Sequence, residues 1–149
     1  MHPDPAPRPS LRNRLLADHR RFEGILERVA VACEANDWGR IQSLWSNFES
    51  SLLAHLDAEE KFLIPALIRS RQRDARTILA EHRHIRLRVA ELRTGVALQT
   101  VRADAARAFV EELRAHSRHE DLVYESTESQ LSDADRASLF DALLSSLQE

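Results

Sequence analysis

One arrangement of histidine and glutamate occurs twice along this chain of 149 residues. In each copy, a lone histidine precedes a His-x-x-x-Glu motif on the next amphipathic segment. The sequence around the lone histidine also repeats, as Leu-Ala-Asp-His-Arg and then as Leu-Ala-Glu-His-Arg. Residues four apart share one face of an α-helix, so the pattern favours helices and predicts two half-sites that converge on one metal centre. The six residues are His19, His55, Glu59, His82, His116 and Glu120.

The composition is typical of a folded helical domain. Charged residues make up 30% of the chain and hydrophobic residues 43%, and only three residues are glycine, which argues against disorder. With a formal net charge of −3 and no basic block, the chain is not expected to bind nucleic acid. Cys33 is the only cysteine, which excludes an intrachain disulfide and fits a reducing compartment. No apolar stretch is long enough to cross a membrane, so we expect a cytoplasmic protein.

Apolar residues recur at three- and four-residue spacing through most of the chain, without the alternation of a strand. Ser10, after Pro9, is a helix N-cap signal, and residues 36–39 form a turn signal. Pro65 should kink the second helix, because proline lacks a backbone donor. The predicted helices cover residues 10–34, 38–69, 73–97, 101–129 and 132–147.

Four long helices with short connections should pack antiparallel. We therefore predict an all-α fold, an up-down-up-down antiparallel four-helix bundle with a short extra C-terminal helix. In this prediction residues 1–9 are a flexible Pro-rich tail with no apolar signal sequence. Residues 10–130 form the bundle, and residues 131–149 form a short helix packed on it.

The spacing of the six residues supports this arrangement. Each helical residue rises about 1.5 Å, so two residues at one height in a bundle lie equally far from the turn between them. Residue 37 is midway between His19 and His55, and residue 99 is midway between His82 and His116. The midpoint between Glu59 and His82 falls at residues 70–71. All three midpoints lie on predicted connections, so the six side chains can share one layer.

Four imidazoles and two carboxylates in a bundle core suit two transition-metal ions. A single histidine, or a single His-x-x-x-Glu pair, is more often an ordinary core or surface feature, and the ordered repeat is what favours metal binding. We expect two iron ions, with zinc as a substitute. Two carboxylates do not cancel the charge of two divalent ions, so a bridging oxo, hydroxo or water ligand is also expected. Two histidines per ion leave coordination positions open for dioxygen, peroxide or nitric oxide.

The order of these six residues resembles the hemerythrin-like, or HHE cation-binding, family. The resemblance extends over about residues 10–125 and rests on the ordered set, because no single motif in it is specific. It implies a non-haem di-iron site in a four-helix bundle. Members of the family bind dioxygen, sense oxygen or redox state, take part in iron homeostasis, or assist repair of iron–sulfur clusters after nitrosative damage.

Two positions depart from the oxygen-carrying hemerythrins. Those carriers have His-x-x-x-His on the third helix, whereas Arg86 stands four residues after His82 here. They also use His-x-x-x-x-Asp on the fourth helix, a spacing that His116 and Asp121 fit, so Asp121 competes with Glu120 as a ligand. We prefer Glu120, because it has a counterpart in the repeat and lies on the His116 face. A site with four histidines resembles the repair and regulatory branch more than the carriers, although the N-terminal region lacks the paired cysteines of some repair proteins.

Other residues are weaker candidates. Glu23, four residues after His19, is open as a further ligand, as a hydrogen-bond acceptor or as a surface salt-bridge partner. Asp18 and Glu81 precede the lone histidines and can orient neighbouring groups, but we expect them on a solvated face. Tyr124 is open as a donor near the site, with core packing favoured.

The expected function is to bind or sense dioxygen or redox state at a di-iron centre. The alternative is an oxidoreductase that acts on nitric oxide or peroxide, or an iron donor in cluster repair, and whether the protein is an enzyme stays open. A small diatomic ligand is the expected partner, and Phe22 and Phe62 are core residues that can also wall its pocket. A protein partner or a second copy of the chain stays open, and no membrane partner is expected.

Overall fold

The computed structural model describes residues 10–145. The predicted tail at 1–9 and the last residues of the fifth predicted helix lie outside this range. Within it the chain is helical and has no strand, which confirms the predicted all-α class. No helix in the described part is both long and apolar enough to span a membrane. The elements are α1 (Leu11–Glu34), α2 (Trp38–Ala58), the π-helical turn η1 (Glu59–Leu63), α3 (Ile64–Ser70), α4 (Gln72–Ala97), α5 (Ala103–Thr127), the 3₁₀ turn η2 (Glu128–Gln130) and α6 (Asp133–Ser145).

Side-chain caps begin three of these helices where the sequence predicts them. Ser10 accepts a hydrogen bond from the backbone N–H three residues later, at 3.3 Å. Asp37 does the same at 3.2 Å before α2, and Ser132 at 3.0 Å before α6. Asn36 takes a φ of 53° in the turn between α1 and α2, a left-handed conformation that asparagine tolerates better than most residues.

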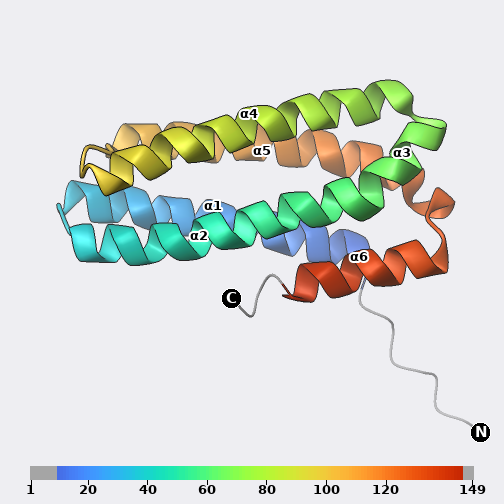
Figure 1. Ribbon diagram of the computed structural model, residues 1–149, viewed down its shortest axis with the longest axis horizontal. Helices are drawn as coiled ribbons and strands as arrows, with labels where there is room; N and C mark the ends of the chain where they lie inside the picture. Colours follow the sequence, from blue (N-terminus) through green and yellow to red (C-terminus); the bar gives the residue numbers. More distant parts are fainter. Residues whose placement is uncertain (1–9, 146–149) are drawn as a thin grey trace, which may run out of the picture.

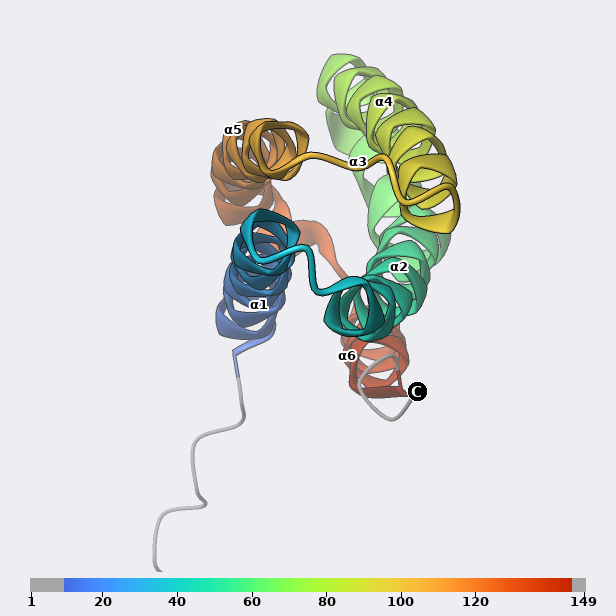
Figure 2. The ribbon, with the colours of Figure 1, turned by 90° about the vertical axis from the view of Figure 1, so that its left-hand side faces the viewer.

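The four long helices lie side by side, and each runs opposite to the next along the chain (Figure 1 and Figure 2). α1 packs against α2 and α5, and α4 packs against α2, α3 and α5. α6 runs along the outside of this group against α1, α2 and η1. The division into domains at residues 9 and 130 stays a prediction.

The predicted second helix, residues 38–69, is divided in the structure. Pro65 has no N–H to donate to the carbonyl of residue 61. Ahead of it the backbone widens into η1, where the N–H of Ile64 bonds to the carbonyl of Glu59, five residues earlier. The prediction of a single helix kinked at Pro65 is therefore corrected to α2, η1 and α3, with a change of direction between α2 and α3 (Figure 1). Short π-helical turns of this kind are frequent at functional sites, and Glu59 is the first residue of this one.

Buried apolar side chains form two separate clusters along the helices. The first cluster lies near the α1–α2 and α4–α5 connections and includes Phe22, Phe48 and Phe109. The second lies near α3 and α6 and includes Leu15 and Leu139. On each long helix, the residues between the two clusters include buried polar side chains. The six residues singled out in the sequence lie in this layer.

Candidate metal centre

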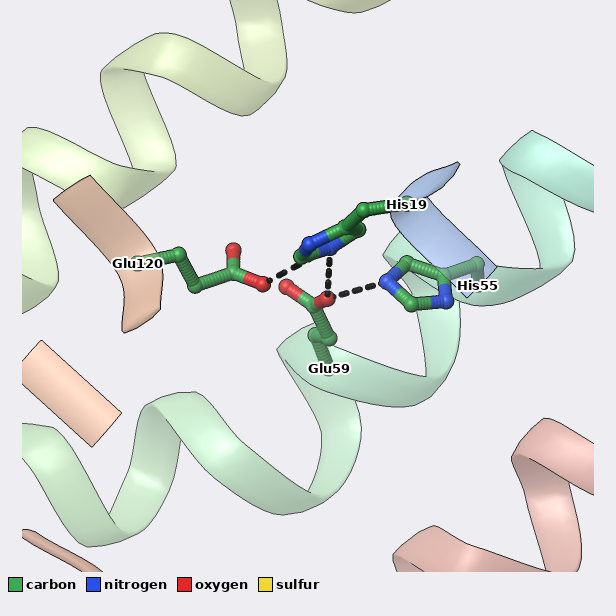
Figure 3. A group of neighbouring side chains, drawn as sticks. All are labelled: His19, His55, Glu59 and Glu120. Atoms are coloured by element: carbon green, nitrogen blue, oxygen red, sulfur yellow. Dashed lines mark ion pairs between the residues drawn. The ribbon is translucent and has the colours of Figure 1, made fainter. Parts of the chain in front are cut away.

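The structure brings the six predicted residues together from four helices and η1. Five of them are buried, and the side chain of His19 is 11% exposed. Figure 3 shows four of them turned toward one another. The six form two overlapping groups, each with ligand atoms within 4.8 Å of one another and both containing the two glutamates. The first group is His19, His55, Glu59 and Glu120, and the second group is Glu59, His82, His116 and Glu120.

The two carboxylate oxygens of Glu59 face different groups. Its Oε1 lies beside Nε2 of His55 and 3.7 Å from Nε2 of His19, which belong to the first group. Its Oε2 lies 3.2 Å from Nε2 of His82, in the second group. Glu59 therefore reaches from one group to the other.

Glu120 is divided in the same way. Its Oε1 lies 3.3 Å from Nε2 of His19 in the first group. Its Oε2 lies 2.9 Å from Nε2 of His116 and 3.4 Å from Nε2 of His82 in the second group. Both glutamates thus present one oxygen to each group, and every histidine presents Nε2.

Two further carboxylates, those of Asp18 and Glu81, bond the outer nitrogen Nδ1 of two of the four histidines. Nδ1 of His55 lies 3.2 Å from Oδ2 of Asp18, and Nδ1 of His116 lies 2.7 Å from Oε1 of Glu81. Glu81 also accepts from Nδ1 of His119 at 2.9 Å. Such contacts fix the orientation and tautomer of an imidazole and raise its basicity as a ligand.

This result corrects the expectation that Asp18 lies on a solvated face, whereas Glu81 keeps a side chain that is 29% exposed. Asp18 is only 2% exposed, and both residues bond to a histidine on another helix. The signal that could have found them is the repeat itself, because an acidic residue precedes the lone histidine in both copies.

The other two histidines differ in their outer contacts. Nδ1 of His19 lies 2.7 Å from the hydroxyl of Ser117 on α5, a residue that the sequence analysis missed. Nδ1 of His82 is buried without a hydrogen bond in the described part of the chain. The nearest acidic atom to it is Oε2 of Glu60, at 3.7 Å.

The charges in this layer balance one another. Burial lowers the pKa of the imidazoles, but Glu120 and Glu59 outweigh it and raise the pKa of His19 and of His82 to about 10. Burial also lowers the pKa of His116, but Glu120 and Glu81 outweigh it and raise that pKa to about 9. Burial and the nearby Glu120 oppose ionisation of Glu59, yet His55 and His19 hold its pKa down to about 2. Without metal, protonated imidazoles therefore supply the positive charge that the carboxylates need.

Several atoms that face the centre lie within ion-pair distance of one another but form no hydrogen bond of good geometry. Nε2 of His55 and of His116, both carboxylate oxygens of Glu59 and Oε1 of Glu120 are buried without a hydrogen bond among the described residues. Buried polar atoms are nearly always paired in folded proteins. Imidazole nitrogen and carboxylate oxygen together suit iron and zinc.

The family model of the hemerythrin HHE cation binding domain matches residues 10–127 of this chain. The chain belongs to the hemerythrin HHE family. The match spans α1 to α5 and contains all six residues of the centre. Comparison with curated proteins and with solved structures gave no significant match.

Two acidic residues that were open as ligands of this hemerythrin-like centre point elsewhere. Asp121 accepts two hydrogen bonds from the guanidinium of Arg12, at 2.9 and 3.1 Å. Glu23 lies 3.5 Å from Nε of Arg114 on α5. Neither belongs to the two groups that can hold a metal.

Two neighbouring positions of the hemerythrin-like domain also have their own partners or packing. Arg86, at the place of the carriers' fifth histidine, bonds Asp57 at 2.8 Å and also Glu60. Tyr124 is 1% exposed and packs in the second apolar cluster. Its hydroxyl has no hydrogen bond among the described residues, and burial raises its pKa to about 12.

A small apolar cavity adjoins the centre on the side of the first cluster. Its volume is about 10 Å³, room for about one water molecule. Phe22 lines it, whereas Phe62 packs against the second cluster and is not part of its wall. The cavity is lined by three histidines and five apolar residues, namely His19, His55, His116, Phe22, Leu52, Leu56, Ile85 and Leu113.

Proposed function

We propose that this hemerythrin-like protein holds two iron ions in a non-haem di-iron site and binds or senses dioxygen or redox state there. The scaffold of the proposed site is an up-down-up-down four-helix bundle. The observation that carries the proposal is that Glu59 and Glu120 each present one oxygen to each group of ligands. Carboxylates placed in this way suit a bridged pair of cations in a bundle core. Bound iron would supply redox chemistry and a position open to a small ligand.

The residues of the chain have distinct roles in this proposal. The two glutamates neutralise charge shared by both ions, and the four imidazoles complete the two groups. Phe22 and the other apolar residues around the small cavity exclude bulk water from the centre. A cavity of about 10 Å³ beside three histidines is too small for a larger substrate.

A second candidate function is reaction with nitric oxide or peroxide, or donation of iron for cluster repair. The observation in its favour is the position of Arg86. An arginine supplies no imidazole at this position, and its guanidinium bonds Asp57 and Glu60 and not the centre. A site with fewer protein ligands favours reactivity over stable oxygen carriage.

Elemental analysis and an optical spectrum test the proposal on aerobically purified, chelator-free protein. We expect about two metal ions per chain, because six ligands are too many for one tetrahedral site. Iron should give near-ultraviolet charge-transfer bands, and zinc should give none. If freshly prepared protein contains no more than trace metal, the proposal is contradicted.

Substitutions of the two glutamates, with a matched control on α5, test the bridging residues. Glu120→Ala should remove most of the metal, since it takes a carboxylate oxygen from both groups, and Glu59→Ala should do the same. Asp121→Ala is the control, because Asp121 bonds Arg12 and not the centre. If Asp121→Ala loses its metal and Glu120→Ala keeps it, the carboxylate that α5 contributes to the centre is wrongly assigned.

A further inference from the structure

The two groups of ligands share one plan but have unequal surroundings. In each group an acidic residue that precedes a lone histidine holds Nδ1 of a histidine on another helix. The side chain of Asp18, which serves His55, is 3% exposed. The side chain of Glu81, which serves His116, is 29% exposed. The repeat is therefore chemically symmetric but not equally shielded from solvent.

The first group adjoins only small cavities, although the side chain of His19 is 11% exposed. Nε of Arg14 lies 3.2 Å from Asp18, and the same guanidinium donates to the backbone carbonyl of Leu143 on α6 at 3.3 Å. These contacts cover Asp18 from outside. The cavity beside His19, between α1 and α5, measures only about 10 Å³ and is lined by Arg12 and Asp121, which are bonded to each other.

The second group adjoins an open pocket between α4 and α5. This surface pocket measures about 480 Å³, and both Glu81 and His116 line it. His119, 32% exposed, shares the Glu81 carboxylate. The remaining wall is mostly apolar and includes Ala115. His116 of the second group thus meets a large surface pocket.

We infer that the metal position formed by Glu59, His82, His116 and Glu120 exchanges its ion, and admits small ligands, through the α4–α5 pocket. The other position, which adjoins only cavities of about 10 Å³, exchanges its ion more slowly. Glu81 is the positioning residue of the faster side, and Asp18 is that of the slower side. The inference rests on the proposed function, because it requires two bound ions.

Release of iron from the full-length protein tests the inference. The protein is loaded with Fe²⁺ without oxygen, its iron content is measured, and ferrozine is then added to capture released Fe²⁺. We expect two phases of equal amplitude. Glu81→Gln keeps an acceptor for His116 but removes the negative charge that raises its basicity, so it should accelerate the fast phase by about tenfold, the scale on which such outer partners change metal affinity. Asp18→Asn should accelerate the slow phase in the same way.

A substitution that fills the pocket tests the route separately from the positioning role. Ala115 is exposed at the pocket wall, so Ala115→Trp should slow the fast phase by severalfold and leave the slow phase unchanged. Glu112→Gln is the matched control, because Glu112 lines the same pocket but bonds Arg88. Both phases should then keep their rates.

The starting iron content separates two kinds of failure. Protein that takes up no iron contradicts the proposed function. Protein that holds two ions but releases them at one rate overturns only the present inference. So does a fast phase that responds to Asp18→Asn and not to Glu81→Gln or Ala115→Trp. Thermal melts of each variant verify that it is folded.

Discussion

Each imidazole of the centre uses its two nitrogens for different purposes. Nε2 faces the glutamates in all four rings, and Nδ1 is bonded outward in three of them. A fixed Nδ1–H leaves the Nε2 lone pair free for a metal. His82 is the exception, because the nearby Glu60 carboxylate is bonded to Arg86 instead. Arg86 thus pairs with the acidic residue that lies nearest to Nδ1 of His82.

Substitution of Arg86 tests how the missing fifth histidine affects reactivity. The reduced unmodified protein is expected to be oxidised quickly by dioxygen. Arg86→His places an imidazole four residues after His82, on the ligand face, and should slow this oxidation in stopped-flow absorbance. Arg86→Gln is the control, because it removes the bonds to Asp57 and Glu60 without adding a ligand. If both variants behave alike, the ion pairs and not the imidazole control the rate. Reversible oxygen uptake by the unmodified protein would make oxygen carriage the better description.

At the scale of single residues, the repeat predicted which side chains meet but not how they are supported. Helical spacing and equal distances from the turns place the six residues in one layer. The burial of Asp18 depends on Arg14 and on the backbone of α6, which are long-range contacts. The repeat marks the acidic residue as a candidate partner, but a sequence pattern does not contain the long-range contacts that bury it. The ligand roles themselves stay predictions that metal analysis decides.

At the scale of elements, local chemistry explains three helix starts, whereas α4 and α5 begin without a side-chain cap. Ser10, Asp37 and Ser132 cap helices at the predicted places. The π turn was not predicted, because Pro65 shows only that one donor is missing. A missing donor can be accommodated by a kink or by an extra residue in one helical turn. Here the turn between Glu59 and Ile64 contains the extra residue.

The docking of α6 is open to a direct test. Leu139 is fully buried in the second cluster, whereas Leu144 on the same helix is 40% exposed. Leu139→Ala should lower the free energy of unfolding by about 2–5 kcal/mol, the usual result for a buried leucine. Leu144→Ala should change it by less than about 0.5 kcal/mol. Denaturant unfolding of both variants measures the difference. Equal, small effects would show that α6 is not docked on the other helices.

At the scale of the whole molecule, the charged layer lies between two apolar clusters and couples the fold to metal and to pH. Buried carboxylates and imidazoles are tolerated there only when opposite charges or metal ions balance them. In metal-free protein, protonated histidines balance the negative charge of the carboxylates. Metal must displace those protons, because only neutral imidazole coordinates. Acid should therefore release the metal.

Thermal melts of metal-free and metal-loaded protein between pH 7 and pH 10 test this coupling. In metal-free protein the pKa values of His19, His82 and His116 are about 10, 10 and 9, above the ordinary 6.5. A raised pKa contributes stability in full below the unfolded value, and that stability is lost as the pH rises through the folded value. The melting temperature of metal-free protein should therefore fall as the pH approaches 10. The loaded protein should melt higher at pH 7, by mass action, and the gap should widen toward pH 10. His84→Gln is the control, because that histidine is 58% exposed and pairs with Glu112. Identical melts with and without metal, or a flat profile for metal-free protein, would show that the centre does not contribute to the stability of the fold.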